Sequence, residues 1–254
     1  MSIIPDPFLN EIIYNYNFVK KDIKEYTDID VNWENGETHQ SKTFEEFFKN
    51  REITEENIYK FYAEQNGYIL NVKNCCVNKL RDLSIIYWLA NYTNQPKVLE
   101  FGGGPGNLAM LIKSYHFDID YCDLGEIKKY AEWRFNKYNL LINTFNKPER
   151  MYDVIITTEV MEHLFDVEKE FNNLVSKINR GGYLLFTESC EATQVAEHLD
   201  KNYSYGGDNA IRMLEKMGLK FHSKTFWERA MCHENNKVNH FNLSPYRFVA
   251  MVKK

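Results

Sequence analysis

Two carboxylates and an imidazole fall within five residues in the segment Glu159-Val-Met-Glu162-His163. At a helix start, side chains at positions i, i+3 and i+4 share a face, so the three groups are predicted to converge. Oxygen and nitrogen ligands of this kind suit a divalent cation such as Mg²⁺ or Mn²⁺. A metal-free general base and a purely structural helix start are the alternatives, and the segment alone leaves all three open.

A glycine-rich turn supplies a second candidate site earlier in the chain. Residues 97–112, KVLEFGGGPGNLAMLI, join a short apolar run, a glycine turn and a helix-like segment. Such a corner binds nucleotides in Rossmann-like units. Glycines are needed there because side chains would block the close approach of the backbone to a ligand. Glycines at positions 102, 104 and 106 follow Glu100, and this spacing differs from the G-x-G-x-x-G of dinucleotide sites. The spacing therefore disfavours a dinucleotide site.

A carboxylate ends the next predicted strand. Residues 117–123 alternate between apolar and polar and finish at Asp123, about 20 residues beyond the glycine turn. An acid at that place can accept hydrogen bonds from both hydroxyls of a ribose. Asp123 also suits a helix N-cap, which is compatible with the same role.

These landmarks resemble a known family. The pattern E-x-G-x-G-x-G of residues 100–106 resembles motif I of the class I S-adenosylmethionine (SAM)-dependent methyltransferases, and residues 152–189 resemble their fourth-to-fifth-strand block. With Asp123, the resemblance runs in family order from 97 to 190. It implies SAM as cofactor and S-adenosylhomocysteine (SAH) as product. The cofactor-binding residues that it implies are Glu100, Gly102, Gly103, Gly104, Gly106, Asp123, Leu124, Thr144, Phe145, Asn146, Thr158 and Glu159.

The carboxylate–imidazole segment carries a narrower resemblance. It is similar to the E-x-x-E-H of small-RNA terminal 2′-O-methyltransferases and of ubiquinone-pathway O-methyltransferases, in which these residues hold a metal. The resemblance implies Glu159, Glu162 and His163 as ligands of Mg²⁺ or Mn²⁺, with His198 as the further histidine. Without a metal, His163 or His198 would serve as general base. The predicted catalytic residues are His163, Glu159 and His198.

The elements that position these residues follow from periodicity and from the family's fold. The resemblance implies an α/β fold whose seven-stranded, mostly parallel Rossmann-like sheet has the order 3-2-1-4-5-7-6, the last strand antiparallel, with helices on both faces. Residues 1–94 show helical patterns and are predicted to form an amino-terminal cap; residues 95–254 are predicted to form the SAM-binding domain. The expected strands are 97–101, 117–123, 140–145, 151–158, 183–187, 219–227 and 246–253. Helices are expected at 167–178, before a turn at 179–182, and at 209–218.

The cap and the tail supply weaker candidates. Family members often use such a cap as a lid, which makes Tyr59, Tyr62, Tyr68 and Asn71 substrate candidates by resemblance. The link 228–245 is longer than a hairpin loop and could fold over the active site. Its Cys232, His233 and His240 lack a second paired ligand cluster, so a polar loop is favoured over a zinc site.

Bulk composition limits the classes of binding partner that we expect. A net charge of −5 gives no electrostatic footprint for nucleic acid. The amino terminus lacks the regions of a signal peptide, and no apolar run approaches the ~20 residues that span a bilayer. Five cysteines without a CxxC pair are expected to be free thiols. We therefore expect a cytoplasmic protein with a small-molecule substrate and no membrane partner; a homodimer is left open.

The resulting hypothesis is methyl transfer from SAM to a small polar acceptor, at a hydroxyl of a sugar, nucleotide-sugar or phosphorylated metabolite. Alternatives are a metal-assisted RNA 2′-O-methyltransferase, an enzyme of the ubiquinone type with an apolar acceptor, and a non-catalytic SAM-binding or partner-binding module. A NAD-dependent oxidoreductase is disfavoured by the glycine spacing.

Overall fold

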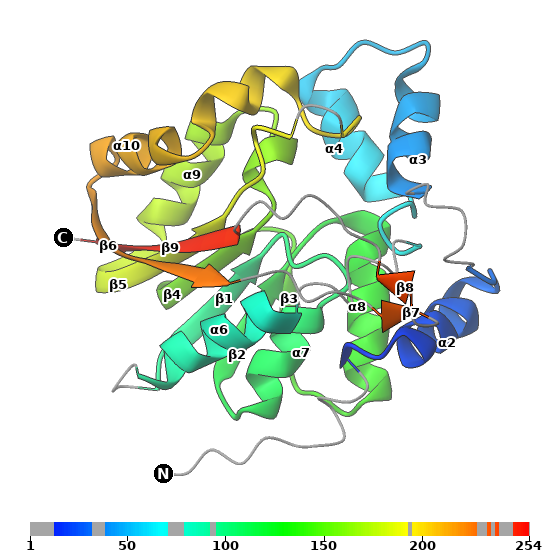
Figure 1. Ribbon diagram of the computed structural model, residues 1–254, viewed down its shortest axis with the longest axis horizontal. Coiled ribbons are helices and arrows are strands. Elements are labelled where there is room, and N and C mark those ends of the chain that lie inside the picture. Colours follow the sequence, from blue (N-terminus) through cyan, green and yellow to red (C-terminus); the bar gives the residue numbers. More distant parts are fainter. Residues whose placement is uncertain are drawn as a thin grey trace.

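A seven-stranded sheet forms the centre of the computed structural model, which describes residues 13–31, 39–70, 79–91, 95–192, 195–227, 233–234, 237–238 and 246–253 (Figure 1). The strand order is β3-β2-β1-β4-β5-β9-β6, and β9 runs antiparallel to both of its neighbours. Since β9 is the seventh strand of this sheet along the chain, the predicted order 3-2-1-4-5-7-6 is confirmed. The strands of the sheet are β1 (Lys97–Phe101), β2 (Asp118–Cys122), β3 (Asn143–Phe145), β4 (Tyr152–Thr158), β5 (Ile178–Thr187), β6 (Leu219–Trp227) and β9 (Tyr246–Lys253). Two short strands, β7 (His233–Glu234) and β8 (Lys237–Val238), pair separately.

Strand register brings the carboxyl ends of the parallel strands to one level. Phe101 at the end of β1 lies beside Cys122 of β2, which lies beside Phe145 of β3. On the other side of β1, Thr158 of β4 is paired with Thr187 of β5. Residues that follow these positions in the chain therefore meet at one edge of the sheet, where ligands of open α/β sheets bind.

Alternating side chains on the central strands divide the core into two faces. On β1, Val98 packs in one cluster with helices α6 (Lys79–Ala90), α7 (Asn107–Ser114) and α8 (Gly125–Lys137). Leu99 packs in a second cluster with α9 (Val167–Ser176) and α10 (Asp208–Lys216). Both residues are fully buried. This alternation is what a strand with both faces covered requires. Two short 3₁₀ helices, η2 (Met161–His163) and η3 (Asp200–Tyr205), lie among these elements.

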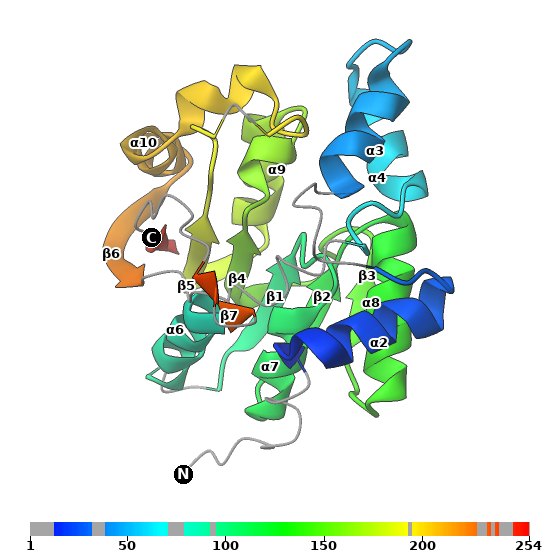
Figure 2. The same ribbon diagram turned by 45° about the vertical axis from the view of Figure 1, so that its right-hand side comes forward.

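An amino-terminal group of helices precedes the sheet, as the helical patterns predict. It contains α2 (Tyr16–Thr27), α3 (His39–Phe48) and α4 (Glu55–Glu64). Thr54 caps α4, its hydroxyl accepting a hydrogen bond from the backbone of Asn57 at 3.2 Å. Figure 2 shows α3 and α4 side by side on the side of the sheet toward which the parallel strands point. We call α3 and α4 the cap; a domain boundary at residue 94 stays a prediction.

Two predicted boundaries are wrong. Helix α9 ends at Ser176, and the expected turn at 179–182 lies inside β5. Ile178 already pairs with Tyr152, and Gly181, with φ +78°, accommodates a register shift within the strand pair instead of ending it. The third strand begins only at Asn143, because Leu141 is 87% exposed and takes no part in the sheet.

Candidate active site

The glycine turn leaves open space at one position. Gly102, Gly104 and Gly106 all have positive φ, which favours glycine. A Cβ built on Gly106 would lie 2.7 Å from the Phe135 ring, whereas a Cβ on Gly104 would meet nothing within 4 Å. The backbone at Gly104 therefore faces space that a ligand could fill. This feature fits the SAM cradle that the sequence predicts.

Asp123 lies directly against this turn. Its Oδ2 accepts a hydrogen bond from the Gly104 N–H at 2.8 Å, and its Oδ1 accepts one from the Leu124 N–H at 2.7 Å. Burial raises the pKa of Asp123 to about 6, against the opposing effect of those two N–H groups. The carboxyl is thus mostly ionised at neutral pH and held at the mouth of the turn, which fits the predicted ribose contact.

Glu100 lies beneath the same turn. It is 2% exposed, and its Oε2 has no hydrogen-bond partner among the described residues. A Cβ on Gly103 would come within 2.7 Å of the Glu100 carboxyl carbon, so the two pack together. Burial, and secondarily the charge of Asp82, raise the pKa of Glu100 well above its usual range. The unpartnered Oε2 at this place is available to a hydrogen-bonding part of a ligand.

Three of the predicted cofactor-binding residues, Thr144, Phe145 and Asn146, lie at and just after the end of β3. Asn146 accepts a hydrogen bond from Lys128 on α8 at 3.0 Å, and the Thr144 hydroxyl donates to Glu132 on the same helix. The Phe145 carbonyl accepts from the Asp123 N–H at 3.3 Å. These contacts hold the end of β3 beside Asp123, as a shared nucleoside site requires.

The segment after β4 is not a helix start, and this corrects a prediction. Glu159 has a left-handed φ of +55°, and its carboxylate Oε1 accepts a 2.6 Å hydrogen bond from Thr187 on β5. Only the three residues Met161–His163 form a 3₁₀ turn. Glu159 therefore does not share a helical face with Glu162 and His163. It stays at the carboxyl end of β4 beside Thr158, where a cofactor contact remains predicted.

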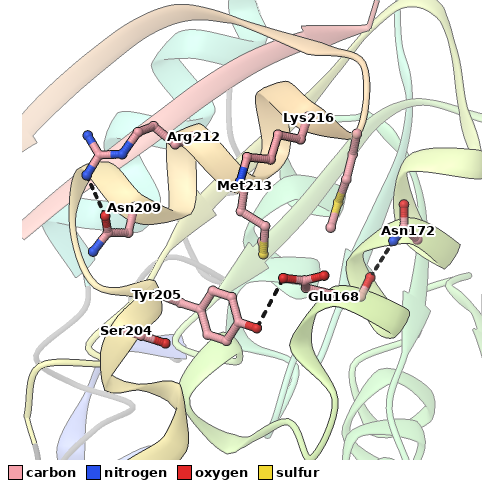
Figure 3. A pocket seen from close by; sticks show the side chains of 9 residues that line it. Glu168, Asn172, Ser204, Tyr205, Asn209, Arg212, Met213 and Lys216 are labelled. Atoms are coloured by element: carbon pink, nitrogen blue, oxygen red, sulfur yellow. Dashed lines mark hydrogen bonds between the residues drawn. The ribbon is translucent and has the colours of Figure 1, made fainter.

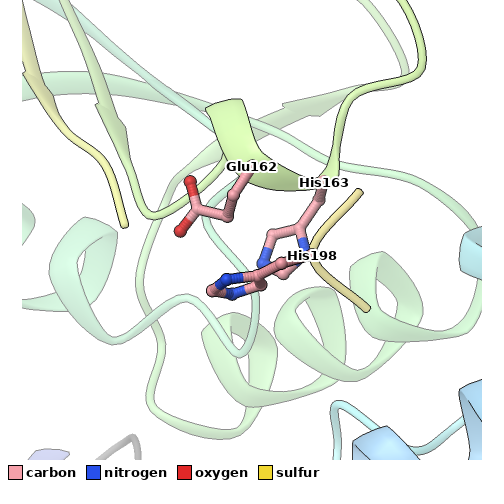
Figure 4. A group of neighbouring side chains, drawn as sticks. All are labelled: Glu162, His163 and His198. Atoms are coloured by element: carbon pink, nitrogen blue, oxygen red, sulfur yellow. The ribbon is translucent and has the colours of Figure 1, made fainter. Parts of the chain in front are cut away.

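A different group of three side chains converges instead. One ligand atom each of Glu162, His163 and His198 lie within 4.8 Å of one another (Figure 4). The centroids of the two imidazole rings are 4.9 Å apart. His198 comes from the segment beyond β5, as the resemblance implies. Of the four predicted ligands, the described part of the chain thus brings Glu162, His163 and His198 together and leaves Glu159 outside the group.

Hydrogen bonds fix the tautomers that we assign to the two imidazoles. The Nδ1 of His163 lies 3.1 Å from the Glu197 carbonyl, and the Nδ1 of His198 lies 2.9 Å from the Ala192 carbonyl. Because a carbonyl oxygen can only accept, each Nδ1 carries the proton and each Nε2 keeps its lone pair. Burial lowers the pKa of both histidines to about 4, so both are neutral near pH 7.

Glu162 completes this group with a further acceptor. Its Oε1 accepts a 2.6 Å hydrogen bond from Ser189, whereas its Oε2 is buried and without a partner in the described part of the chain. Burial, with the Glu159 charge as a smaller cause, raises the pKa of Glu162 well above its usual range. Three acceptors facing one another are stabilised by a shared proton or by a cation. The donor set fits a divalent metal, and it fits equally a protonated Glu162 that donates to an imidazole.

Two tyrosines of the amino-terminal region lie against His163. The ring centroids of Tyr62 and Tyr68 are 6.1 and 6.0 Å from the His163 ring, and the Tyr68 hydroxyl donates to that of Tyr62 at 3.3 Å. Tyr59 points elsewhere, donating to Glu170 on α9 at 2.9 Å. Asn71, the fourth predicted substrate candidate, lies outside the described residues. Tyr62 and Tyr68 are therefore the tyrosines near the candidate chemistry.

Sequence reasoning missed a buried ion pair at the start of α6. Arg81 is 7% exposed and donates through Nε to Asp82 at 2.8 Å, and Asp82 also accepts from the Tyr14 hydroxyl at 2.7 Å. Burial lowers the pKa of Arg81, but Asp82 and then Glu159 raise it by more, so the guanidinium stays charged. The signal was an Arg–Asp pair opening an otherwise apolar helical pattern. Arg81 interacts electrostatically with Glu159 at the end of β4 and with Glu100 beneath the glycine turn, which makes it a candidate for a ligand's anionic group.

A cavity of about 460 Å³ lies elsewhere, between α9, η3 and α10 (Figure 3). Glu168, Tyr205 and Arg212 are among its lining residues. It contains none of the predicted site residues, and two of its charged groups, Glu168 and Arg212, hydrogen-bond to Tyr205 and Asn209 of the same wall. The candidate active site is therefore assigned to the strand edge and not to this cavity.

Comparison with known proteins identifies the class. A family model described as a methyltransferase domain matches residues 65–240, which is more than half of the chain. The chain therefore belongs to the class I SAM-dependent methyltransferases, and SAM is its cofactor.

Individual relatives are distant. The ubiquinone biosynthesis O-methyltransferase of Rickettsia canadensis is 28% identical over 122 residues, which are 44% of this chain and 52% of that protein. The chain thus spans about half the length of this relative. TehB from Haemophilus influenzae has a similar structure at 17% identity, covering 67% of this chain and 62% of that chain with a TM-score of 0.52. Magnesium protoporphyrin IX methyltransferase from Synechocystis, solved with bound SAH, is 12% identical and covers 93% and 100% with a TM-score of 0.51. At these identities the two structures show the shared fold.

Two further predictions concern the membrane and the tail. Among the described residues, none of the helices combines the length and apolar character needed to cross a bilayer. Cys232 and His240 lie outside the described part of the chain, and so does most of the link 228–245. The placement of that link over the active site stays a prediction.

Proposed function

We propose that this methyltransferase acts on a hydroxyl of a small polar acceptor, such as a sugar, nucleotide-sugar or phosphorylated metabolite. The observation that carries the proposal is the neutral His163–His198 pair, set beside the cofactor edge of the sheet and beneath Tyr62 and Tyr68. Hydroxyl acceptors need a group that takes up a proton during transfer, whereas the sulfonium of SAM needs no help as a leaving group. The printed function of the Rickettsia relative, an O-methyltransferase, supports oxygen as the acceptor atom.

Each part of the site has a role in this proposal. Asp123 would accept hydrogen bonds from the cofactor ribose, with Leu124 and the end of β3 nearby. The turn at Gly104 would hold the methionine end, and the Arg81 guanidinium would bind its carboxylate. Bound SAM supplies the methyl group as an electrophile. Thr158 and Glu159, at the end of β4, would lie beside the sulfonium.

The proton would leave through an imidazole. Because the Glu197 carbonyl holds the Nδ1–H of His163, the Nε2 lone pair is the atom able to accept a proton from an acceptor hydroxyl. His198 is held in the same way by Ala192 and can serve as the second acceptor of the pair. The half-buried rings of Tyr62 and Tyr68 limit the access of water and leave polar hydroxyls for binding an oxygen-rich acceptor.

A metal-assisted version of the same reaction is a second candidate. The buried, unpartnered Oε2 of Glu162 beside two Nε2 lone pairs supports it. Glu162, His163 and His198 would hold Mg²⁺ or Mn²⁺, which would supply a Lewis acid that orients an acceptor hydroxyl. Glu159 is left out of the set, because its carboxylate is bonded to Thr187. Turnover that persists in excess chelator would exclude the metal-assisted mechanism and leave the imidazole as the general base.

The other candidates are separated by one set of experiments. Calorimetry with SAM and SAH tests cofactor binding, and release of SAH in a screen of sugars, nucleotide-sugars and phosphorylated metabolites tests turnover. Turnover on one of these and loss of it in His163→Gln, with SAH affinity unchanged, is the expected result. Tight SAH binding with no turnover on any acceptor class would favour a binding module, and salt-sensitive turnover on RNA would favour 2′-O-methylation. An apolar phenol as sole acceptor would favour the ubiquinone type.

A further inference from the structure

Glu197 is bonded from two directions. Its side-chain Oε2 accepts a hydrogen bond from the Ser41 hydroxyl on α3 at 2.7 Å. Its main-chain carbonyl accepts the Nδ1–H of His163 at 3.1 Å. The residue is 3% exposed. A single buried residue thus joins the first turn of the cap to the imidazole of the candidate active site.

The chain around Glu197 contacts both the cap and the candidate active site. Leu199 packs in the apolar cluster of the cap, with Phe44, Phe47 and Phe61. Its backbone N–H donates to the Glu162 carbonyl in η2 at 3.0 Å. Movement of the cap would therefore shift this short segment and alter its contacts with both η2 and His163.

Burying a carboxylate here has a cost that an apolar side chain would avoid. The neighbouring cap contacts at Leu199 and Ala196 are apolar, and a carboxylate loses solvation when it is buried among them. A hydrogen bond to Ser41 offsets part of that loss and, unlike an apolar contact, it has one required direction and distance. The Ser41–Glu197 contact therefore specifies a position for the segment as well as stabilising it.

We propose that Glu197 is a positioning residue that couples docking of the cap to the orientation of His163. When α3 is in place, Ser41 fixes the Glu197 side chain, and the Glu197 carbonyl then holds the imidazole with its Nε2 lone pair directed away from that carbonyl. The proposal rests on the proposed function only where it gives His163 a part in catalysis. The coupling itself is a property of the folded chain and can be measured without an acceptor.

The test is ¹⁵N NMR of the histidine rings in the SAH complex, at one fixed pH near 8, with the His163 signals assigned by their loss in His163→Gln. The wild-type ring is expected to show a single tautomer with the proton on Nδ1. Ser41→Ala is expected to give averaged tautomers and at least tenfold faster hydrogen exchange in α3, with SAH affinity within about twofold of wild type. Ser84→Ala is the matched control, because the Ser84 hydroxyl donates an exposed hydrogen bond to the Leu80 carbonyl within α6, which lies away from the cap (Figure 2).

A second variant keeps the test decisive if Ser41→Ala does not fold. Glu197→Gln keeps an oxygen acceptor for Ser41 and is expected to retain the single tautomer. A single Nδ1–H tautomer in Ser41→Ala, or averaged tautomers in Glu197→Gln, would overturn the positioning role. Tautomer averaging in Ser41→Ala without turnover on any acceptor would overturn the proposed function alone and leave the coupling standing. Once an acceptor is found, Ser41→Ala is expected to lower kcat about tenfold without changing KM for SAM.

Discussion

Gly125, the first residue of α8, lies against Ala63 near the carboxyl end of α4. Its φ is +51°, and a Cβ built on it would lie 2.0 Å from the carbonyl oxygen of Ala63 and 2.3 Å from its Cα. Both are backbone atoms, so no side-chain rotation can relieve the contact. Replacement by alanine must therefore displace α4.

The size of the effect follows from two contributions. The left-handed conformation costs a residue with a Cβ about 1–2 kcal/mol. Overpacking against a fixed neighbour adds about 1–3 kcal/mol. Gly125→Ala is thus expected to lower the free energy of unfolding by about 2–5 kcal/mol, and hydrogen exchange should accelerate first in α4.

Gly181→Ala separates the two contributions. Gly181 has φ +78° with nothing within 4 Å of an added Cβ, so only the backbone strain applies. Urea unfolding of both variants should therefore show a larger loss for Gly125→Ala by about 1–3 kcal/mol. Equal losses, with α4 amides exchanging at the wild-type rate in both, would refute the docking of α4 on α8.

Two further predictions concern the charged groups of the site. Arg81→Gln should weaken SAH binding in calorimetry by about 1.5–3 kcal/mol, because a charged hydrogen bond to the ligand carboxylate is lost. Binding of 5′-methylthioadenosine, which lacks the amino-acid end, should be unchanged. Equal weakening of both ligands would contradict the carboxylate contact. The second prediction is a pH dependence: because burial holds the pKa of His163 at about 4, below its ordinary value of about 6.5, the unfolded chain takes up a proton that the folded chain does not. Stability from this group is complete above about pH 6.5 and is lost as the pH falls toward 4, so wild type should lose about 3 kcal/mol relative to His163→Gln over that range in urea unfolding. A pH-independent difference would show that His163 is not buried in its neutral form.

Local patterns in the sequence were enough for most of the sheet. Strand β1, the glycine turn and Asp123 were predicted because their signals are local: alternation, apolar runs and a strand-ending acid can be recognised from neighbouring residues. The parallel register then necessarily brings Asp123 to Gly104, as observed. Gly181 was misjudged because glycine in a turn and glycine in an irregular strand look alike without the partner strand.

The candidate catalytic group was harder to predict, since its contacts are long-range. Glu159 leaves the expected helical face because Thr187, on the adjacent strand, binds its carboxylate. Arg81 was overlooked because its burial depends on Asp82 and Tyr14 meeting across 68 residues of chain. His198 was placed beside His163 by resemblance alone, and the structure brings the two rings together.

The central claim is that SAM lies across the turn at Gly104 with its ribose on Asp123. Calorimetry of SAH binding to Gly104→Ala and Gly181→Ala tests it most directly, because both glycines have a positive φ and neither added Cβ lies within 4 Å of a protein atom. We expect Gly181→Ala to bind SAH as wild type does and Gly104→Ala to bind at least tenfold more weakly, since only there does the Cβ enter the ligand's space. Equal, wild-type affinity in both variants would contradict the assigned cofactor site.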